Sequence, residues 1–433
     1  MSEKISNTQS CPVVPLSRCP ENLSARLRRA AHAQMYFVLG LMVLFTEREF
    51  FKLTPVDIVL GIAAGLWGLS VVLDWQGMKP VLKGLSRYWP MGLYAGWMLI
   101  SACFAEVPGL ALVKVFQTVL YFVVAVILLH DFFTSNERQM LHGSLILLAV
   151  FVAFLIMAAT QYFGSADVYG VRGFFKHGNV FGGLVAMLTP VCFAVLCYAR
   201  QWWVKVGLGM VVALSLVVTL GGAAYAAVLL ASAGIAAVRG KWWFLATSAA
   251  LIFFQAVVLE KGAERGWLRE NVTEHLGSVE IFEADGQPAP RYGEWQAALL
   301  LMTDYPVVGV GPGHYNRMIG QYFGTIPKSP RDKNESDVEI QNQYLVLGAT
   351  TGLAGLLAFL AMVVVALREG VSAASRLEGW QRGLAAGCVA GVLAFSVVLV
   401  WHSLLVRGTG LVFVALLVAC HVLNAKKLKV ENG

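Results

Sequence analysis

Apolar residues fill about a dozen runs along this chain, and polar segments separate them. The hydrocarbon core of a bilayer is about 30 Å thick, so about 20 apolar residues in a helix cross it. We therefore predict an all-α, polytopic membrane protein with about twelve transmembrane helices. The runs cover 34–51, 54–73, 88–104, 110–129, 141–163, 178–198, 202–220, 223–238, 242–259, 344–367, 383–401 and 404–423.

Lys and Arg fall in every second segment between these runs. Basic residues are enriched in cytoplasmic loops, so this alternation predicts that both termini are cytoplasmic. The basic positions are Arg26, Arg28, Arg29, Lys79, Lys83, Arg87, Arg138, Arg200, Lys205, Arg239, Lys241, Arg368, Arg376, Arg382, Lys426, Lys427 and Lys429. The predicted organisation is a cytoplasmic tail (1–32), nine helices (33–259), a periplasmic loop with short helices (260–340), three helices (341–425) and a cytoplasmic tail (426–433).

Composition agrees with a membrane protein. The chain is 58% hydrophobic and 14% charged, whereas soluble domains carry roughly a quarter charged residues. Its net charge of +7 comes from residues beside the spans, so we expect no nucleic-acid partner. None of the seven cysteines falls in a predicted exported loop, and the chain has no zinc spacing, P-loop or dinucleotide motif. We predict neither a metal nor a cofactor.

Three predicted outward segments carry unusual residues, and the first precedes the run at 178–198. It places Arg172, Lys176, His177 and Asn179 at the mouth of a helix, among glycines. A basic cluster beside a helix N-terminus suits an anion such as a phosphate. A tight loop with interfacial anchors is the alternative.

The second segment, 290–316, reads as a helix start followed by a glycine-rich turn. Arg291 would lie in the first turn, where a cation is electrostatically unfavourable. Its position there indicates a ligand or an acidic partner, and Glu294 is the candidate partner. The turn presents His314, which is either functional or an ordinary surface histidine.

The third segment, 339–352, begins a span with polar residues. Such residues cap a helix or face a wet cavity. Gly348 and Gly352 form a small-residue pair that favours close helix packing. Capping and packing explain the glycines fully, but they explain Gln341, Asn342 and Gln343 less well.

These segments together resemble the O-antigen ligase and O-antigen polymerase superfamily of bacterial membrane glycan transferases. The resemblance rests on three stretches: Arg172-Gly-Phe-Phe-Lys-His-Gly-Asn179, then Arg291-Tyr-Gly-Glu-Trp295 with 306–313, and finally Gln341-Asn342 with Gly352-Leu-Ala-Gly355. Members move a glycan from undecaprenyl pyrophosphate to an acceptor hydroxyl without metal or nucleotide. The acceptor is the lipid A core in ligases, a lipid-linked repeat in polymerases and a protein hydroxyl in a third group.

The resemblance also implies roles for residues. Arg172 and Arg291, with Lys176 and Asn179, are expected to bind the pyrophosphate. Two departures stand out: the family's His-Asn pair reads Gln341-Asn342 here, and an expected arginine is replaced at 221–222. The candidate substitutes are His314 or Glu339 as the base, and Lys176, Arg265 or Arg317 as the extra cation.

We therefore expect an inner-membrane enzyme that transfers an undecaprenyl-pyrophosphate-linked O-antigen to the lipid A core at the periplasmic face. A polymerase that joins lipid-linked repeats is the nearest alternative. A polysaccharide transporter and a catalytically inactive assembly scaffold are alternatives of other classes. The expected partners are the lipid-linked glycan, the lipid or glycan acceptor and membrane lipids.

Overall fold

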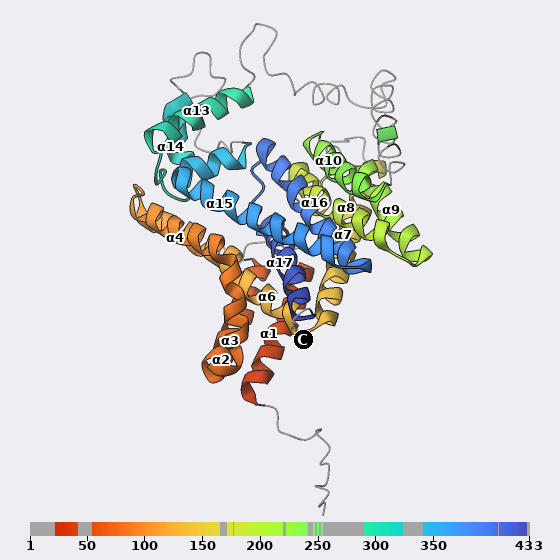
Figure 1. Ribbon diagram of the computed structural model, residues 1–433. Helices are drawn as coiled ribbons and strands as arrows, with labels where there is room; N and C mark the ends of the chain where they lie inside the picture. Colours follow the sequence, from red (N-terminus) through yellow and green to blue (C-terminus); the bar gives the residue numbers. More distant parts are fainter. Residues whose placement is uncertain are drawn as a thin grey trace, which may run out of the picture.

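The computed structural model describes residues 22–41, 54–164, 171–175, 177–219, 222–240, 290–323, 341–405 and 407–430, with four positions between 246 and 253. All regular structure in these residues is helical, as predicted (Figure 1). The elements are α1 (Leu23–Leu41), α2 (Pro55–Leu73), α3 (Trp75–Gly84), η2 (Leu85–Tyr88), α4 (Trp89–Cys103), α5 (Pro108–Thr118), η3 (Val119–Val124), α6 (Ala125–Ser135), α7 (Glu137–Gly164), α8 (Gly178–Tyr198), α9 (Trp202–Val218), α10 (Gly222–Arg239), α13 (Pro290–Asp304), α14 (Tyr315–Phe323), α15 (Gln343–Arg376), α16 (Gly379–Trp401) and α17 (Arg407–Val430).

Seven helices in the described part of the chain are long and apolar enough to cross a membrane. They are Pro55–Leu73, Pro108–Ser135, Glu137–Gly164, Gly178–Tyr198, Gln343–Arg376, Gly379–Trp401 and Gly408–Ala425. Each corresponds to a predicted apolar run. The protein is therefore all-helical in its described residues and suited to a membrane.

The predicted number of twelve spans is not reached by these criteria. Trp202–Val218 and Ala224–Ala236 are apolar but shorter, and α4 has 15 residues. The predicted run at 242–259 lies almost wholly outside the described residues, and so does most of the predicted loop at 260–340.

Helix α1 begins at Leu23, inside the segment that we predicted to be a cytoplasmic tail. Its polar residues are not simply solvated. Arg28 donates from Nε to Asp131 Oδ2 at 2.9 Å and from Nη2 to Asp131 Oδ1. His32 Nε2 lies 2.9 Å from the same Oδ2, and Trp67 donates to it at 3.0 Å. Asp131 is fully buried, so α1, α2 and α6 share one charged junction.

The two ends of the bundle differ. At one end, which we call the basic end, α1 begins, α8 ends at Tyr198, and α16 begins at Gly379. We call the other end the loop end. Helix α8 begins there, α16 ends there, and α13 and α14 are located there. Figure 1 shows α13 and α14 at the top, with the start of α1 and the C-terminus toward the bottom.

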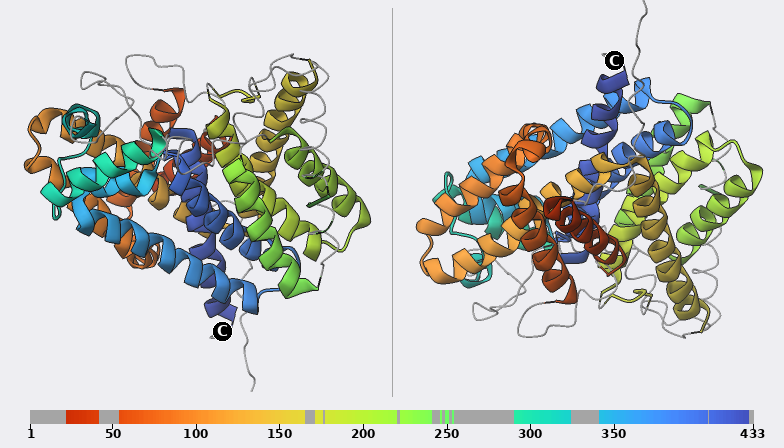
Figure 2. Two further views of the ribbon diagram at one scale, coloured as in Figure 1. Left: turned by 90° about the horizontal axis from the view of Figure 1, so that it is seen from above. Right: turned by 90° about the horizontal axis from the view of Figure 1, so that it is seen from below.

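Helices α8, α16 and α17 form the centre. In α17, 94% of the apolar stretch is buried, against 28% in α2 and in α7. Figure 2 shows α17, in dark blue, enclosed by other helices, with α4 and α9 at opposite margins. Burial on all sides explains why α8 and α17 have no polar face.

Glycines spaced four residues apart bring α16 against the backbone of α8. A Cβ atom on Gly391 would lie 2.3 Å from the carbonyl oxygen of Met187, and one on Gly387 would lie 2.6 Å from the Cα of Val191. Gly383 has a similarly close neighbour at 3.0 Å. Small residues at such spacing let two helices in a membrane approach closely, and no larger side chain fits here.

Candidate functional site

The loop preceding α8 has a fixed backbone. Gln161 Oε1 accepts hydrogen bonds from the backbone N–H groups of Arg172 and Gly173, both at 2.9 Å, and Gln161 Nε2 donates to the Gly173 carbonyl at 2.8 Å. Gly173 has φ of +61°, and a Cβ there would lie 2.8 Å from the Phe154 ring. The glycine is therefore required by both backbone conformation and space.

This loop presents polar side chains at the surface. Arg172, His177 and Asn179 are exposed. His177 occupies the N-cap position of α8 and makes no capping hydrogen bond with its side chain. Lys176 lies outside the described residues. The loop thus holds Arg172 and Asn179 where a ligand could reach them, beside a helix N-terminus that favours an anion.

Helix α15 is interrupted near its start. Gly352 has φ of +68°, which is not helical, and a Cβ on it would lie 2.0 Å from the Val307 carbonyl oxygen. The turn that fills the interruption runs from 305 to 314 and contains Gly309, Gly311 and Gly313, all with positive φ. These glycines give the turn its shape because residues with a Cβ rarely adopt such φ values.

Backbone hydrogen bonds join the turn to the interruption. Val310 N–H donates to the Ala349 carbonyl at 2.9 Å, and Gly311 N–H donates to the Thr350 carbonyl at 3.0 Å. In return, Leu353 N–H donates to the Pro306 carbonyl at 2.8 Å. An interrupted helix leaves carbonyl and N–H groups without partners, and this turn supplies them.

Side chains of helix α4 also bind the interrupted part of α15 and the turn at 305–314. Trp97 Nε1 donates to the Thr351 carbonyl at 2.9 Å, and Ser101 Oγ lies 2.6 Å from the Val308 carbonyl and 3.0 Å from that of Thr350. The interruption is therefore closed by side chains from one helix and by the backbone of another segment. We call this assembly of α4, 305–314 and 349–353 the turn joint.

His314 lies inside the turn joint instead of on its surface. Its side chain is fully buried. Val107 N–H donates to His314 Nε2 at 3.1 Å, and His314 Nδ1 lies 3.3 Å from the Pro312 carbonyl. The sequence predicted a flexible loop presenting this histidine, but the ring fastens 104–107 to the turn. Nε2 must be unprotonated to accept the Val107 hydrogen bond.

The polar start of α15 is largely explained by capping. Asn342 Oδ1 accepts from Tyr344 N–H at 3.0 Å and from Leu345 N–H at 3.1 Å, which satisfies two unpaired donors of the first turn. Gln341 is half-buried beside it. Neither residue has a geometry here that identifies it as catalytic.

Gln343 ties α15 to the segment after α16. Its Oε1 accepts from Ser403 Oγ at 3.1 Å and from Leu405 N–H at 3.0 Å. The adjoining Leu404 packs against α8 at Gly183, where a Cβ would lie 2.9 Å from a Leu404 methyl. Segment 402–405 therefore links the start of α15 to the first turns of α8, next to the Arg172 loop.

Helices α13 and α14 form a small layer over α15. Buried residues of the three helices and of the turn at 305–314 make up a separate apolar cluster: Ala297, Ala298, Leu301, Val310, Tyr315, Ile319, Phe323 and Ala349. Arg317 is exposed in the first turn of α14. The side chain of Arg291 is outside the described residues, as are Arg265 and Glu339 entirely, so their predicted roles stay predictions.

Ionisable groups of this layer are perturbed. Burial, followed by the nearby Glu294 carboxylate, raises the pKa of Tyr315. Burial also raises the pKa of Tyr322, whose hydroxyl donates to Asp304 Oδ2 at 2.6 Å and is held neutral by that carboxylate. In the part of the chain that is described, no group of three His, Cys, Asp or Glu residues is placed to hold a metal ion.

No protein-family model matches the chain, and no curated protein sequence matches it either. The arrangement of the loop end is therefore interpreted from its own residues. They offer exposed cationic and amide side chains on a fixed backbone, beside a rigid joint that holds the starts of two helices.

Proposed function

We propose that this protein transfers a glycan from an undecaprenyl-pyrophosphate carrier to an acceptor hydroxyl at the loop end. One observation carries the proposal: three segments that resemble motifs of the O-antigen ligase superfamily lie at the same end of the bundle. The second and third are joined by the hydrogen bond from Leu353 N–H to the Pro306 carbonyl at 2.8 Å. An enzyme that acts on a lipid head group needs its polar side chains gathered at one membrane face, and this arrangement favours that use.

The orientation is part of the proposal. Arg28, Arg200 and Arg382 lie toward the basic end, and basic residues are enriched on the cytoplasmic side of membrane proteins. We assign the basic end and both termini to the cytoplasm, and the loop end to the periplasm. The membrane is then the inner membrane of a bacterium, where undecaprenyl-linked glycans are presented.

The reaction is a substitution at the anomeric carbon of the carried glycan. A bond forms between that carbon and the acceptor oxygen, and the bond from the carbon to the phosphate oxygen breaks. The pyrophosphate leaves on its lipid, and the acceptor proton passes to a base. Negative charge develops on the leaving oxygen, so fixed cations near it would lower the barrier.

Arg172 is the best-supported cation of the described residues. Its side chain is exposed, while its backbone N–H is held by Gln161. Arginine forms paired, charge-assisted hydrogen bonds with phosphates, and a fixed backbone reduces the ordering needed to make them. Asn179 and Arg317 are exposed at the same end. Arg291, Lys176 and Arg265 stay in the proposal on sequence grounds.

The residue that accepts the proton of the acceptor hydroxyl has to be chosen between His314 and Glu339. His314 would have to release the Val107 N–H before it could take a proton at Nε2, and it has no exposed surface. We therefore give His314 a positioning role in the turn joint. Glu339 is the preferred base of this proposal, because a carboxylate can accept the proton and the glutamine at 341 cannot.

The lipid A core is the proposed acceptor, as expected for a ligase. A polymerase would use a second lipid-linked repeat, and a protein-directed enzyme would use a protein hydroxyl. All three run the same substitution at the same end of the bundle. They differ in the acceptor alone, so the products distinguish them.

The interrupted helix α15 bears on the alternative of a transporter. Transporters use unwound segments of helices to bind ions through freed carbonyl groups. Here the carbonyls of Ala349, Thr350 and Thr351 accept hydrogen bonds from Val310, Gly311 and Trp97. These carbonyls are already used, which favours a structural joint over an ion site.

The direct test is transfer by the purified full-length protein, given an undecaprenyl-pyrophosphate-linked glycan and a lipid A core acceptor. Arg172→Ala should be nearly inactive, and Arg172→Lys should be clearly impaired because lysine lacks the planar fork. Arg138→Ala is the matched control, since Arg138 is also an exposed arginine but begins α7 at the basic end. Full activity of Arg172→Ala would rule out its assignment.

A deletion strain examined by lipopolysaccharide gel identifies the acceptor. Loss of the ladder with accumulation of lipid-linked polymer indicates a ligase. A band of core plus one repeat indicates a polymerase. An unchanged gel, with no glycan transfer by the purified protein to any of the three acceptors, would contradict the proposal.

A further inference from the structure

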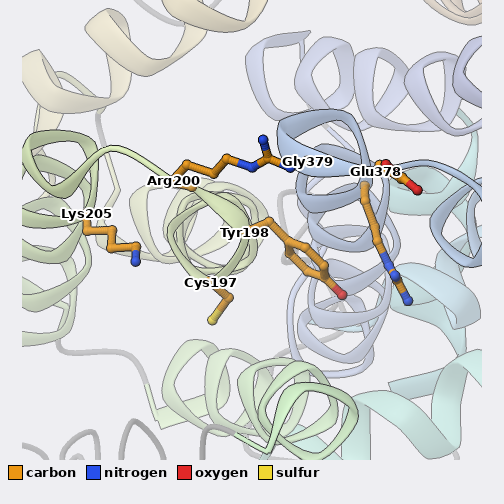
Figure 3. Close-up of a pocket in the computed structure, with 8 residues that line it drawn as sticks. Cys197, Tyr198, Arg200, Lys205, Glu378 and Gly379 are labelled. Atoms are coloured by element: carbon orange, nitrogen blue, oxygen red, sulfur yellow. The ribbon is translucent and has the colours of Figure 1, made fainter.

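A second polar region lies at the basic end, far from the loop-end segments. A cavity of about 550 Å³ opens between the turn that joins α8 to α9 and the turn that joins α15 to α16. Figure 3 shows Lys205 on one side of Tyr198 and Glu378 on the other, with the Arg200 side chain reaching across from the Lys205 side toward Gly379. The lining includes three cationic side chains, Arg200, Lys205 and Arg382, against one carboxylate, Glu378. The cavity is therefore electropositive.

Two helix N-termini adjoin this cavity. Helix α9 begins at Trp202 and α16 at Gly379, and neither preceding residue, Gln201 or Glu378, caps its helix with a side-chain hydrogen bond. The first N–H groups of a helix carry partial positive charge and need acceptors. Together with the three cations, they favour an anionic occupant that can accept several hydrogen bonds.

Arg382 is held at the wall of the cavity. Its guanidinium carbon lies 5.4 Å from the centre of the Tyr198 ring, at a distance where a cation is attracted to an aromatic face. Its Nε is buried and has no hydrogen-bond partner among the residues that the structure describes. Because Nε is closed to any ligand, an anion in the cavity would meet the part of Arg382 that lines it.

The electropositive cavity continues into an apolar one. A second cavity of about 350 Å³ lies between α10, α15 and α16, and Tyr198 and Arg382 line both. Its other walls are mostly aliphatic and include Leu230, Ile235, Val238, Val371, Val389 and Leu393. A small soluble anion would leave this groove unused, whereas an acyl chain would fill it.

Exposed tryptophans mark the depth of the site. Trp202 and Trp203 are 75% and 63% exposed at the start of α9, next to Lys205. Tryptophan is enriched where the hydrocarbon of a bilayer meets its head groups. The electropositive cavity then lies at head-group level, and the apolar groove extends toward the hydrocarbon.

We propose that the two cavities form one binding site for an anionic phospholipid of the surrounding bilayer. The phosphate lies among Arg200, Lys205 and Arg382, and one acyl chain lies in the groove between α10, α15 and α16. The proposal does not depend on the glycan-transfer function, because it concerns the opposite end of the bundle. Three observations support it. Three cationic side chains line one cavity, two helices beside it begin without a side-chain cap, and an aliphatic groove adjoins it.

The test is lipid titration of the purified full-length protein in detergent, followed by native mass spectrometry. Phosphatidylglycerol should bind more tightly than phosphatidylcholine with the same acyl chains. Neutralising all three cations (Arg200→Gln, Lys205→Gln and Arg382→Gln) should weaken phosphatidylglycerol binding on the order of a hundredfold, at roughly fivefold per cation. Arg138→Gln, outside both cavities, is the control and should change nothing.

The acyl groove has its own variant. Gly234 lines the apolar cavity, and a Cβ on it would meet no atom within 4 Å. Gly234→Leu therefore places bulk in the groove without a clash and keeps every cation. Each methylene that it displaces should weaken phosphatidylglycerol binding roughly fourfold.

Glycerol phosphate separates a lipid from a soluble phosphate. The proposal expects glycerol phosphate to bind far more weakly than phosphatidylglycerol. Equal binding of the two, with no effect of Gly234→Leu, would overturn it in favour of a soluble anion. Equal binding of the two phospholipids would overturn it as well. If the triple variant does not fold, Lys205→Gln alone should still show a roughly fivefold loss, and its absence counts against the site.

Discussion

At the loop end, backbone hydrogen bonds join the turn to the interrupted helix α15, whereas at the basic end charged side chains join α1, α2 and α6. The turn joint connects 306–311 to 349–353 through three backbone hydrogen bonds, and its glycines allow the close approach. The junction of α1, α2 and α6 instead depends on one carboxylate, Asp131, with three side-chain donors. The two regions should therefore respond to different kinds of substitution.

The difference also bears on function. Backbone hydrogen bonds fix the turn joint, and the Gln161 side chain fixes the backbone of the Arg172 loop, while the side chains of Arg172 and Arg317 are exposed. At the basic end, side chains are already used for structure around Asp131, but not around Arg200 and Lys205, which enter no ion pair within the described residues. Arg200 and Lys205 are therefore available to bind an anion.

The largest expected effect is at the turn joint. Gly352→Ala should lower the free energy of unfolding by about 3 kcal/mol or more. Its φ of 68° and ψ of −178° lie in a region open essentially to glycine alone, which costs an alanine about 1–3 kcal/mol, and its Cβ would meet the Val307 carbonyl oxygen at 2.0 Å. Thermal unfolding in detergent and the yield of folded protein measure it. Gly96→Ala in α4 is the matched control, as its Cβ would meet no atom within 4 Å. Equal thermal stability of the two variants would contradict the importance of the turn joint for folding.

The next effect tests the charged junction. Asp131→Asn keeps the shape but removes the charge that Arg28 and His32 share, and hydrogen bonds to charged groups contribute about 1.5–3 kcal/mol. We expect a loss of about 2–3 kcal/mol in thermal unfolding. Combining it with Arg28→Gln should cost less than the sum of the single losses, since both remove one interaction. Strict additivity would show that the pair is not coupled.

His314 separates a structural role from a catalytic one. His314→Ala leaves the Val107 N–H buried without its acceptor, which should cost about 2 kcal/mol of stability. The transfer rate per folded molecule and its pH profile should stay those of the wild type. If the variant instead loses an acidic limb at pH values near the ordinary histidine pKa of about 6.5, then His314 is the base and Glu339 is not.

The smallest effect concerns Tyr322 and Asp304 at the loop end. Tyr322→Phe should cost about 1 kcal/mol or less, because the hydrogen bond is near the surface. Burial and Asp304 raise the pKa of Tyr322 above its ordinary value of 10.0, so the folded state favours the neutral phenol. The advantage of the wild type should be complete below pH 10 and should shrink as the pH rises above it. A difference that grows with pH would reverse this interpretation.

Helix positions were predictable where a long apolar run ends abruptly. The run at 178–198 is predicted and observed with the same bounds, because polar residues flank it on both sides. Helix α2 follows Thr54, which forms a capping box with Asp57. Helix α1 was placed too late, since its first turns are polar and are stabilised by Asp131, about a hundred residues away.

The candidate site was predictable only in part. The sequence indicated that 172–179, 290–316 and 339–352 gather at one end of the bundle. It gave no sign that His314 is buried, because its partner Val107 lies 207 positions earlier. The basic-end cavity has no sequence signature for the same reason: Arg200 and Arg382 lie far apart in the chain, and only the fold brings them to one cavity.

Helix α8 begins beside the Arg172 loop and ends at the electropositive cavity, and three glycines of α16 hold it by backbone contact. Two helices in such close contact resist sliding past each other, so we expect α8 and α16 to tilt together as one rod. Its 21 residues measure about 32 Å, close to the bilayer hydrocarbon of about 30 Å. A thinner bilayer would increase the tilt of this rod and shift both of its ends at once. Membrane thickness thereby becomes a mechanical input that reaches the loop end without any ligand.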